Sequence, residues 1–316
     1  MARNFMGAEK TRNQRSLLDY LILVLKGICM GASDVIPGVS GGTMAFILGI
    51  YEELIFSIKS FDLECVRLAL RFRFREVLER IRWKFLLAVL SGIGIAIVSL
   101  ARALAWLLQN EPVLIWSFFF GLISASVITV SRRVNKWSFS LLGSAALGAA
   151  GAFWLVGLIP AQTPNATWYL FLSGAIAICA MILPGISGAF ILVLLGKYQY
   201  VLQALNNHDL VVLATVATGA VVGIILFSRL LGWLFSSHHD FTVSILTGFM
   251  LGSLRKIWPW KKASEVVASG HSAAYQVYKN VFPDHVDMRT IWALALMALG
   301  CLVVLALDRM ARQKPQ

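Results

Sequence analysis

The chain has 316 residues, of which 58% are hydrophobic and only 14% are charged. Its mean hydropathy is +0.75, which excludes an ordinary soluble domain because such a chain would expose too much apolar surface. The net charge of +12 does not indicate a nucleic-acid partner, since basic residues in a membrane protein follow its topology.

Apolar segments run through the whole chain, and several reach the roughly 20 residues that cross a bilayer as a helix. We expect these segments at 17–33, 43–58, 83–109, 112–131, 137–159, 168–183, 186–205, 210–236, 241–257 and 289–307. The sequence therefore predicts an all-α polytopic membrane protein, with a cytoplasmic N-terminal segment at 1–16 and a C-terminal tail at 308–316.

The first two segments are short and are separated by a break in which Pro37 and Gly38 interrupt the helix. Ser40 is well placed to cap the outgoing helix. The backbone N–H groups that follow would then be free to bind an anion such as phosphate or carboxylate. We predict substrate binding at this break, although a structural kink is the alternative; its residues are Ser40, Gly41, Gly42 and Thr43.

Two acidic residues flank this break. Asp34 precedes it, and either binds a coupling cation, carries a proton, or serves as a polar cap. Glu52 follows it and is expected at the membrane interface. We group both with Pro37 and Gly38 as coupling or structural residues.

A basic stretch follows at 59–82, and within 66–84 basic and apolar residues alternate. This pattern is typical of an interfacial helix on anionic lipid, and equally of a solvated cytoplasmic loop. Further on, Arg102 lies inside an apolar segment, and Arg229 matches it in the second half of the chain. Each either binds the substrate headgroup or extends its side chain to the nearer membrane interface.

The break recurs 147 residues later, where P-G-I-S-G at 184–188 repeats P-G-V-S-G at 37–41. Pro184 and Gly185 are the matching coupling or structural residues, and we predict that Ser187, Gly188 and Ala189 also bind substrate. Beyond the break, Gly92, Arg102 and Gly121 match residues 127 positions later, so an insertion of 20 residues falls within the basic stretch 59–82. Matched interruptions of apolar segments indicate the binding site of a secondary transporter.

Each half contains two short arms and three longer helices, so each crosses the membrane an odd number of times. The sequence therefore predicts an inverted twofold repeat, 17–159 and 160–307, with two re-entrant helical hairpins. With both termini inside, 18 Lys and Arg residues lie on the cytoplasmic side and 6 outside. The outside cluster at 255–262 departs from the positive-inside rule.

No catalytic, metal or cofactor site is expected. Gly38-Val39-Ser40-Gly41-Gly42 fits the G-x-S-x-G pattern of hydrolases, but that pattern needs a preceding strand and a histidine partner. All five histidines lie in expected loops, and the four cysteines form no C-x-x-C pair.

The strings G-A-S-D-V-I-P-G-V-S-G-G-T at 31–43, G-I-Y-E at 49–52 and I-L-P-G-I-S-G at 182–188 resemble one family, the bacterial and archaeal polyprenyl-phosphate (undecaprenyl-phosphate) transporters. The resemblance covers 17–307. It implies a protein of the bacterial inner membrane that returns undecaprenyl phosphate from the outer to the inner leaflet for peptidoglycan synthesis. Coupling to H⁺ or Na⁺ is suspected for the family.

Two other functions fit the same architecture. Undecaprenyl-pyrophosphate phosphatases use a similar P-G-x-S-R-S motif, but Gly41 and Gly188 occupy the place of its arginine, and the glutamate-rich motif of those enzymes has no counterpart. A secondary transporter of small anions is the other alternative. The oligomeric state cannot be predicted from the sequence.

Overall fold

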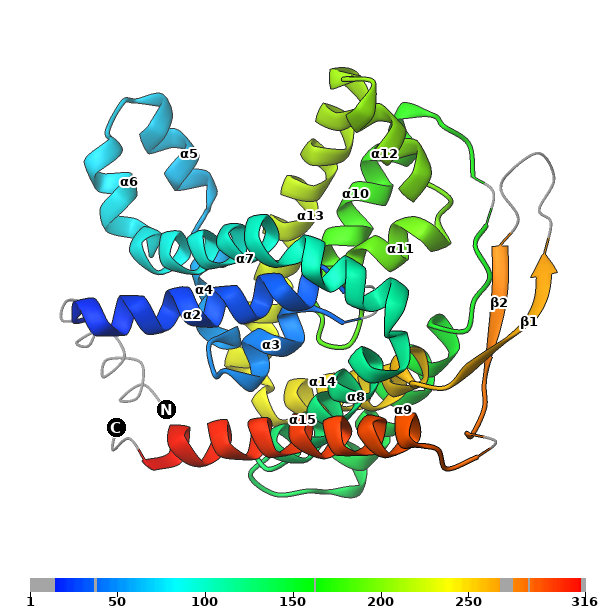
Figure 1. The fold of residues 1–316 in the computed structure, drawn as a ribbon. Coiled ribbons are helices and arrows are strands. Elements are labelled where there is room, and N and C mark those ends of the chain that lie inside the picture. Colours follow the sequence, from blue (N-terminus) through cyan, green and yellow to red (C-terminus); the bar gives the residue numbers. More distant parts are fainter. Residues whose placement is uncertain (1–14, 37–38, 162, 268–274, 284, 314–316) are drawn as a thin grey trace.

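A computed structural model describes residues 15–36, 39–161, 163–267, 275–283 and 285–313. Within this part the chain is almost entirely helical. Its strands are β1 (Lys261–Val267) and β2 (Tyr275–Asn280), which pair as an antiparallel hairpin. This hairpin lies at one end of the molecule, opposite the start of the first described helix and the end of the last one (Figure 1).

Apart from α5 and α6, which occur only in the first half, and the longer last helix of the second half, the helices follow a similar order of lengths in the two halves of the chain. The first half contains α2 (Leu17–Asp34), α3 (Gly41–Ile47), α4 (Tyr51–Lys59), α5 (Leu63–Leu70), α6 (Phe74–Arg80), α7 (Trp83–Asn110), α8 (Pro112–Ser131) and α9 (Phe139–Leu155). The second half contains α10 (Thr167–Ile182), α11 (Gly188–Leu194), α12 (Tyr198–Asn206), α13 (Leu210–Ser237), α14 (His239–Ile257) and α15 (Met288–Gln313).

Four described helices, α7, α8, α13 and α15, are long and apolar enough to cross a membrane. The pairs α3–α4 and α11–α12 also have that composition, but they bend by 118° and 106°. Many large apolar side chains on α7, α13 and α15 are exposed, including Val98, Leu226 and Leu302. Such surfaces are typical of helices that face lipid, so the fold is that of a multi-pass helical membrane protein.

The sequence predicts each second arm, 43–58 and 186–205, as a single segment, whereas the structure breaks both. Each bend contains a glycine with positive φ, Gly49 at +71° and Gly196 at +65°. These two glycines are themselves 147 residues apart, and L side chains rarely adopt this backbone conformation. The basic stretch is also more structured than a loop, because it forms the short helices α5 and α6.

Close backbone contacts at glycines join the helices in pairs. Gly27 on α2 packs against the backbone of Val89 on α7, and Gly174 on α10 packs in the same way against Val216 on α13. Small residues at such contacts let membrane helices approach closely. The pairs α2–α7 and α10–α13 therefore correspond between the two halves.

Two further pairs join one half to the other. Gly121 on α8 lies against Met297 of α15, and Gly248 on α14 lies against Ala145 of α9. Gly121 and Gly248 are the residues that the sequence matches at an offset of 127. The last helix of each half thus packs on the opposite half, and neither half buries its helices alone.

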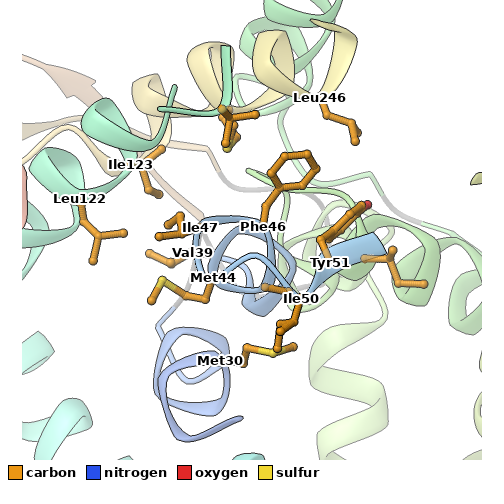
Figure 2. Close-up of a cluster of buried hydrophobic side chains, with 14 of the residues drawn as sticks. Met30, Val39, Met44, Phe46, Ile47, Ile50, Tyr51, Leu122, Ile123 and Leu246 are labelled. Carbon is orange, nitrogen blue, oxygen red and sulfur yellow. The ribbon is translucent and has the colours of Figure 1, made fainter. Parts of the chain in front are cut away.

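The apolar core surrounds α3, all seven residues of which are buried. Figure 2 shows side chains of α2, α4, α8 and α14 around it, among them Met30, Tyr51, Ile123 and Leu246. The ring of Phe46 lies 4.7 Å from that of Tyr51, measured between ring centroids. The first break therefore leads directly into the centre of the protein.

Candidate functional site

The two breaks meet at the centre of the molecule, where hydrogen bonds join residues 141 to 143 positions apart in sequence. The hydroxyl of Ser40 donates to the carbonyl oxygen of Met181 at 2.8 Å. The N–H of Gly185 donates to the hydroxyl of Thr43 at 2.8 Å. Polar side chains of the first break thus bind backbone groups that the second break leaves without helical partners.

Glycine allows this close approach. A Cβ atom at Gly42 would collide with the carbonyl oxygen of Ile182 and lie 3.0 Å from its carbonyl carbon. Gly185 has φ of +90° and lies against the backbone of Phe249 and Met250. The structure therefore explains Gly42 and the motif glycine Gly185 by close contact with backbone atoms.

The start of α3 is fully hydrogen-bonded. Gly41 N–H donates to the Asp34 carboxylate at 2.7 Å, Gly42 N–H donates to the Ser40 hydroxyl at 3.1 Å, and Thr43 N–H donates to the Ser40 carbonyl at 2.9 Å. The prediction that these N–H groups are free is wrong. Asp34 lies one turn before the break, and its side chain folds back to accept the N–H of Gly41. Anion binding at 40–43 stays a prediction, and Pro37 and Gly38 lie outside the described residues.

The second break differs from the first at this point. Met181 stands where Asp34 stands in the first half, and among the described residues no carboxylate accepts a hydrogen bond from the start of α11. Ser187 is the N-cap residue of α11 but its side chain accepts no capping hydrogen bond. Pro184 and Gly188 are buried, and Ala189 is exposed. The start of α11 is thus the less occupied of the two helix starts.

The two matched arginines lie away from these contacts. Arg102 is exposed on α7, and Arg229 is half-buried on α13. Among the described residues, neither makes a hydrogen bond or ion pair. Their role in headgroup binding stays a prediction.

Glu52 belongs to a polar cluster at the end of the molecule where α2 begins. One of its carboxylate oxygens lies 3.3 Å from Nε2 of His239, whose Nδ1 lies 3.3 Å from the Asp240 carboxylate. Next to it, Glu53 pairs with Arg15 at 2.8 Å. Glu52 thus joins α4 to the start of α14 and does not reach the break.

The surroundings of Ser40 do not resemble those of a hydrolytic nucleophile. Its hydroxyl donates to a backbone carbonyl and accepts from Gly42 N–H, and in the described part of the chain no histidine bonds to it. The residues that the structure describes also contain no group of three or more His, Cys, Asp or Glu side chains suited to a metal ion.

One neighbour of the second break was missed by sequence reasoning. The ammonium of Lys256 lies 4.3 Å from the ring centroid of Phe190, and Phe190 directly follows Ala189. Lys256 belongs to the basic cluster that departs from the positive-inside rule, and that departure was the available signal.

Comparison with known proteins places this geometry in context. The sequence model of the undecaprenyl phosphate translocase-like family matches residues 30–275 of the chain. A polyprenyl-phosphate transporter of Vibrio cholerae is 41% identical over 303 residues, which are 94% of this chain and 98% of the relative. A polyprenyl-phosphate transporter of Staphylococcus aureus is 31% identical over 259 residues, 75% of this chain and 86% of the relative. No solved structure matches the chain significantly.

Proposed function

The chain belongs to the undecaprenyl phosphate translocase-like family, and from this premise we propose that it carries polyprenyl phosphate across the bacterial cytoplasmic membrane. The observation that carries the proposal is similarity over nearly the whole chain to a relative named for polyprenyl-phosphate transport. We propose movement of undecaprenyl phosphate from the outer to the inner leaflet, which returns this carrier lipid for peptidoglycan synthesis. We also propose that the protein is a transporter without enzymatic activity.

We propose an inverted twofold repeat, 17–159 and 160–307, as the basis of alternating access. Matched helix lengths, the matched bends at Gly49 and Gly196, and the equivalent pairs α2–α7 and α10–α13 support this proposal. In this arrangement α2–α4 and α10–α12 are re-entrant hairpins that enter from opposite sides. Both termini then lie in the cytoplasm and the β1–β2 hairpin lies outside.

Cysteine accessibility tests this topology in a variant without the four native cysteines. Lys136→Cys should react with a membrane-impermeant reagent only from the cytoplasm, and Asn207→Cys only from outside, because both side chains are exposed and the proposed topology puts their loops on opposite sides. Val39→Cys and Ile186→Cys should react slowly from either side, since both positions are buried at the breaks. Rapid reaction of these two positions from opposite bulk solvents would show ordinary loops instead of hairpins.

We propose that the phosphate binds at the start of α11, at Ser187, Gly188 and Ala189, and at 40–43 when Asp34 leaves the start of α3. The uncapped start of α11 supports the first of these positions. Arg102 and Arg229, near opposite membrane faces, assist the headgroup on either side. A prenyl tail can remain in lipid throughout, because only the phosphate needs a polar path.

Transport into proteoliposomes tests the function and its site together. Wild-type protein should move undecaprenyl phosphate between leaflets, but not a water-soluble ester such as glycerol phosphate. Arg102→Ala and Arg229→Ala should each slow lipid transport about tenfold, the lower end of the cost of one lost charge-assisted hydrogen bond. Lysine at these positions should restore transport only in part, because it lacks the planar fork of arginine.

The outcomes separate the two claims. Transport of glycerol phosphate in place of the lipid would overturn the lipid proposal and favour a small-anion transporter. Normal lipid transport by the double arginine variant would leave the function intact and remove both arginines from the site. Release of phosphate from undecaprenyl pyrophosphate, above that of a Ser40→Ala variant, would favour an enzyme.

A further inference from the structure

Two lysines meet where α14 ends and β1 begins. The ammonium of Lys261 donates to the backbone carbonyl of Lys256, so the two residues are in direct contact. Lys256 lies over the ring of Phe190 on α11 at 4.3 Å, and Lys261 lies over the ring of Trp116 on α8 at 4.8 Å. The pair thus connects the hairpin end of the molecule with the first turn of α11.

No ion pair neutralises the two positive charges of this pair among the described residues. Both side chains are half-buried, and neither forms an ion pair with a carboxylate among the described residues. Burial, with the charge of Lys256 beside it, lowers the pKa of Lys261 to about 8. Contacts with aromatic rings offset only part of the free-energy cost of burying the two ammonium groups. An anion bound between these groups would lower that cost and reduce the repulsion between the two charges.

A structural role for Lys256 would explain its position at the end of α14 but not the lack of an acceptor for its ammonium group. A cation in the last turn of a helix is stabilised by the helix dipole, and Lys256 occupies the last turn of α14. At the other end of the molecule, Arg133 after α8 lies over the ring of Phe46 on α3, and it also donates to the Phe46 carbonyl. Among described residues, the Lys256 ammonium has no such acceptor.

A cavity of about 290 Å³ adjoins Lys261. Its polar lining includes Lys261, Lys262, His285, Asp287, Arg289 and Thr290. The acidic groups nearby are already engaged: Asp287 accepts the N–H of Thr290 and so caps α15, and Arg289 binds Glu111 at 2.6 Å. The cavity therefore gives an anion a polar path to Lys261, which in turn contacts Lys256.

We propose that Lys256 and Lys261 form a receiving site at the outer face for the phosphate monoester of a lipid. The headgroup would bind there before it moves to the start of α11. The inference rests on the proposed function and adds a site to it. Lysine binds phosphate as a point charge with three donors. Phe190 places the site within one helical turn of Ser187, so a headgroup can pass from one to the other.

Binding measurements in phosphatidylcholine nanodiscs test the site. The probes are farnesyl phosphate, a short lipid monophosphate, and inorganic phosphate. The variant Lys256→Gln/Lys261→Gln should bind farnesyl phosphate at least about tenfold more weakly than wild type, because two charge-assisted contacts are lost. Lys279→Gln is the control for charge: it removes one lysine charge from an exposed position on β2, and its affinity should equal that of wild type. Lys256→Arg/Lys261→Arg should retain most of the affinity.

Unchanged affinity in the glutamine variant, with wild-type thermal stability, would overturn the site while leaving the transport function untouched. An equal loss in Lys279→Gln would also overturn it, since the effect would then be one of general charge. Equal affinity for inorganic phosphate and farnesyl phosphate would show a free-phosphate site and overturn the lipid assignment. Weaker binding in the glutamine variant, together with a wild type that moves no lipid, would support the site and contradict the proposed function.

Discussion

Replacing Gly42 with alanine is expected to lower transport at least about 100-fold. The added Cβ would collide with the carbonyl oxygen of Ile182 and lie 3.1 Å from that of Met181. Both are backbone atoms, so no side-chain rotation can relieve the contact. The two breaks must then separate, which also stretches the hydrogen bond from Ser40 to Met181. Lipid transport in proteoliposomes, at matched protein levels, measures the effect.

Gly94→Ala is the control for this experiment. Gly94 lies in α7, and a Cβ there meets nothing within 4 Å. Alanine also favours a helix interior over glycine, so this variant should transport at the wild-type rate. Rapid transport by Gly42→Ala would show that the close contact between the breaks is not needed for the transport cycle.

Much of the helical framework could be predicted because hydrophobic segment length decides it. Every expected apolar segment contains a helix, and the matched glycines Gly121 and Gly248 both lie at close helix contacts. The bends at Gly49 and Gly196 were missed because each is a single residue within an apolar run, and its φ is not visible in composition. The β1–β2 hairpin was missed because its strands are short and flanked by residues that also suit loops.

The site was less predictable because its contacts join residues far apart in the chain. Sequence patterns identified Ser40 as an N-cap, and the structure confirms its bond with Gly42 N–H. They could not show that the same hydroxyl reaches Met181, since that depends on how the two halves pack. For Asp34 the sequence left three roles open, a cation site, a proton carrier and a polar cap. Its hydrogen bond to Gly41 depends on the local path of the chain, which the sequence pattern does not show.

Replacing Asp34 with asparagine is expected to remove the dependence of transport on H⁺ or Na⁺ and to change headgroup affinity much less. The carboxylate of Asp34 accepts the N–H of Gly41 at 2.7 Å and occupies the start of α3. A phosphate that approaches this position meets a like charge, so Asp34 must be neutralised or displaced each time the headgroup passes. A proton or a bound cation can do this, which links ion binding to lipid movement.

Asparagine separates the charge from the structural role. Its side-chain oxygen can still accept the Gly41 N–H, and asparagine caps helices about as well as aspartate, so α3 should keep its start. Asp209→Asn is the matched control, because Asp209 caps α13 through Val212 N–H at 3.2 Å and is exposed, away from the break. Transport rates measured across gradients of pH and Na⁺ should be flat for Asp34→Asn and should vary as in wild type for Asp209→Asn. If Asp34→Asn transported lipid with the wild-type ion dependence, Asp34 would be a cap alone, and coupling would have to arise at another residue.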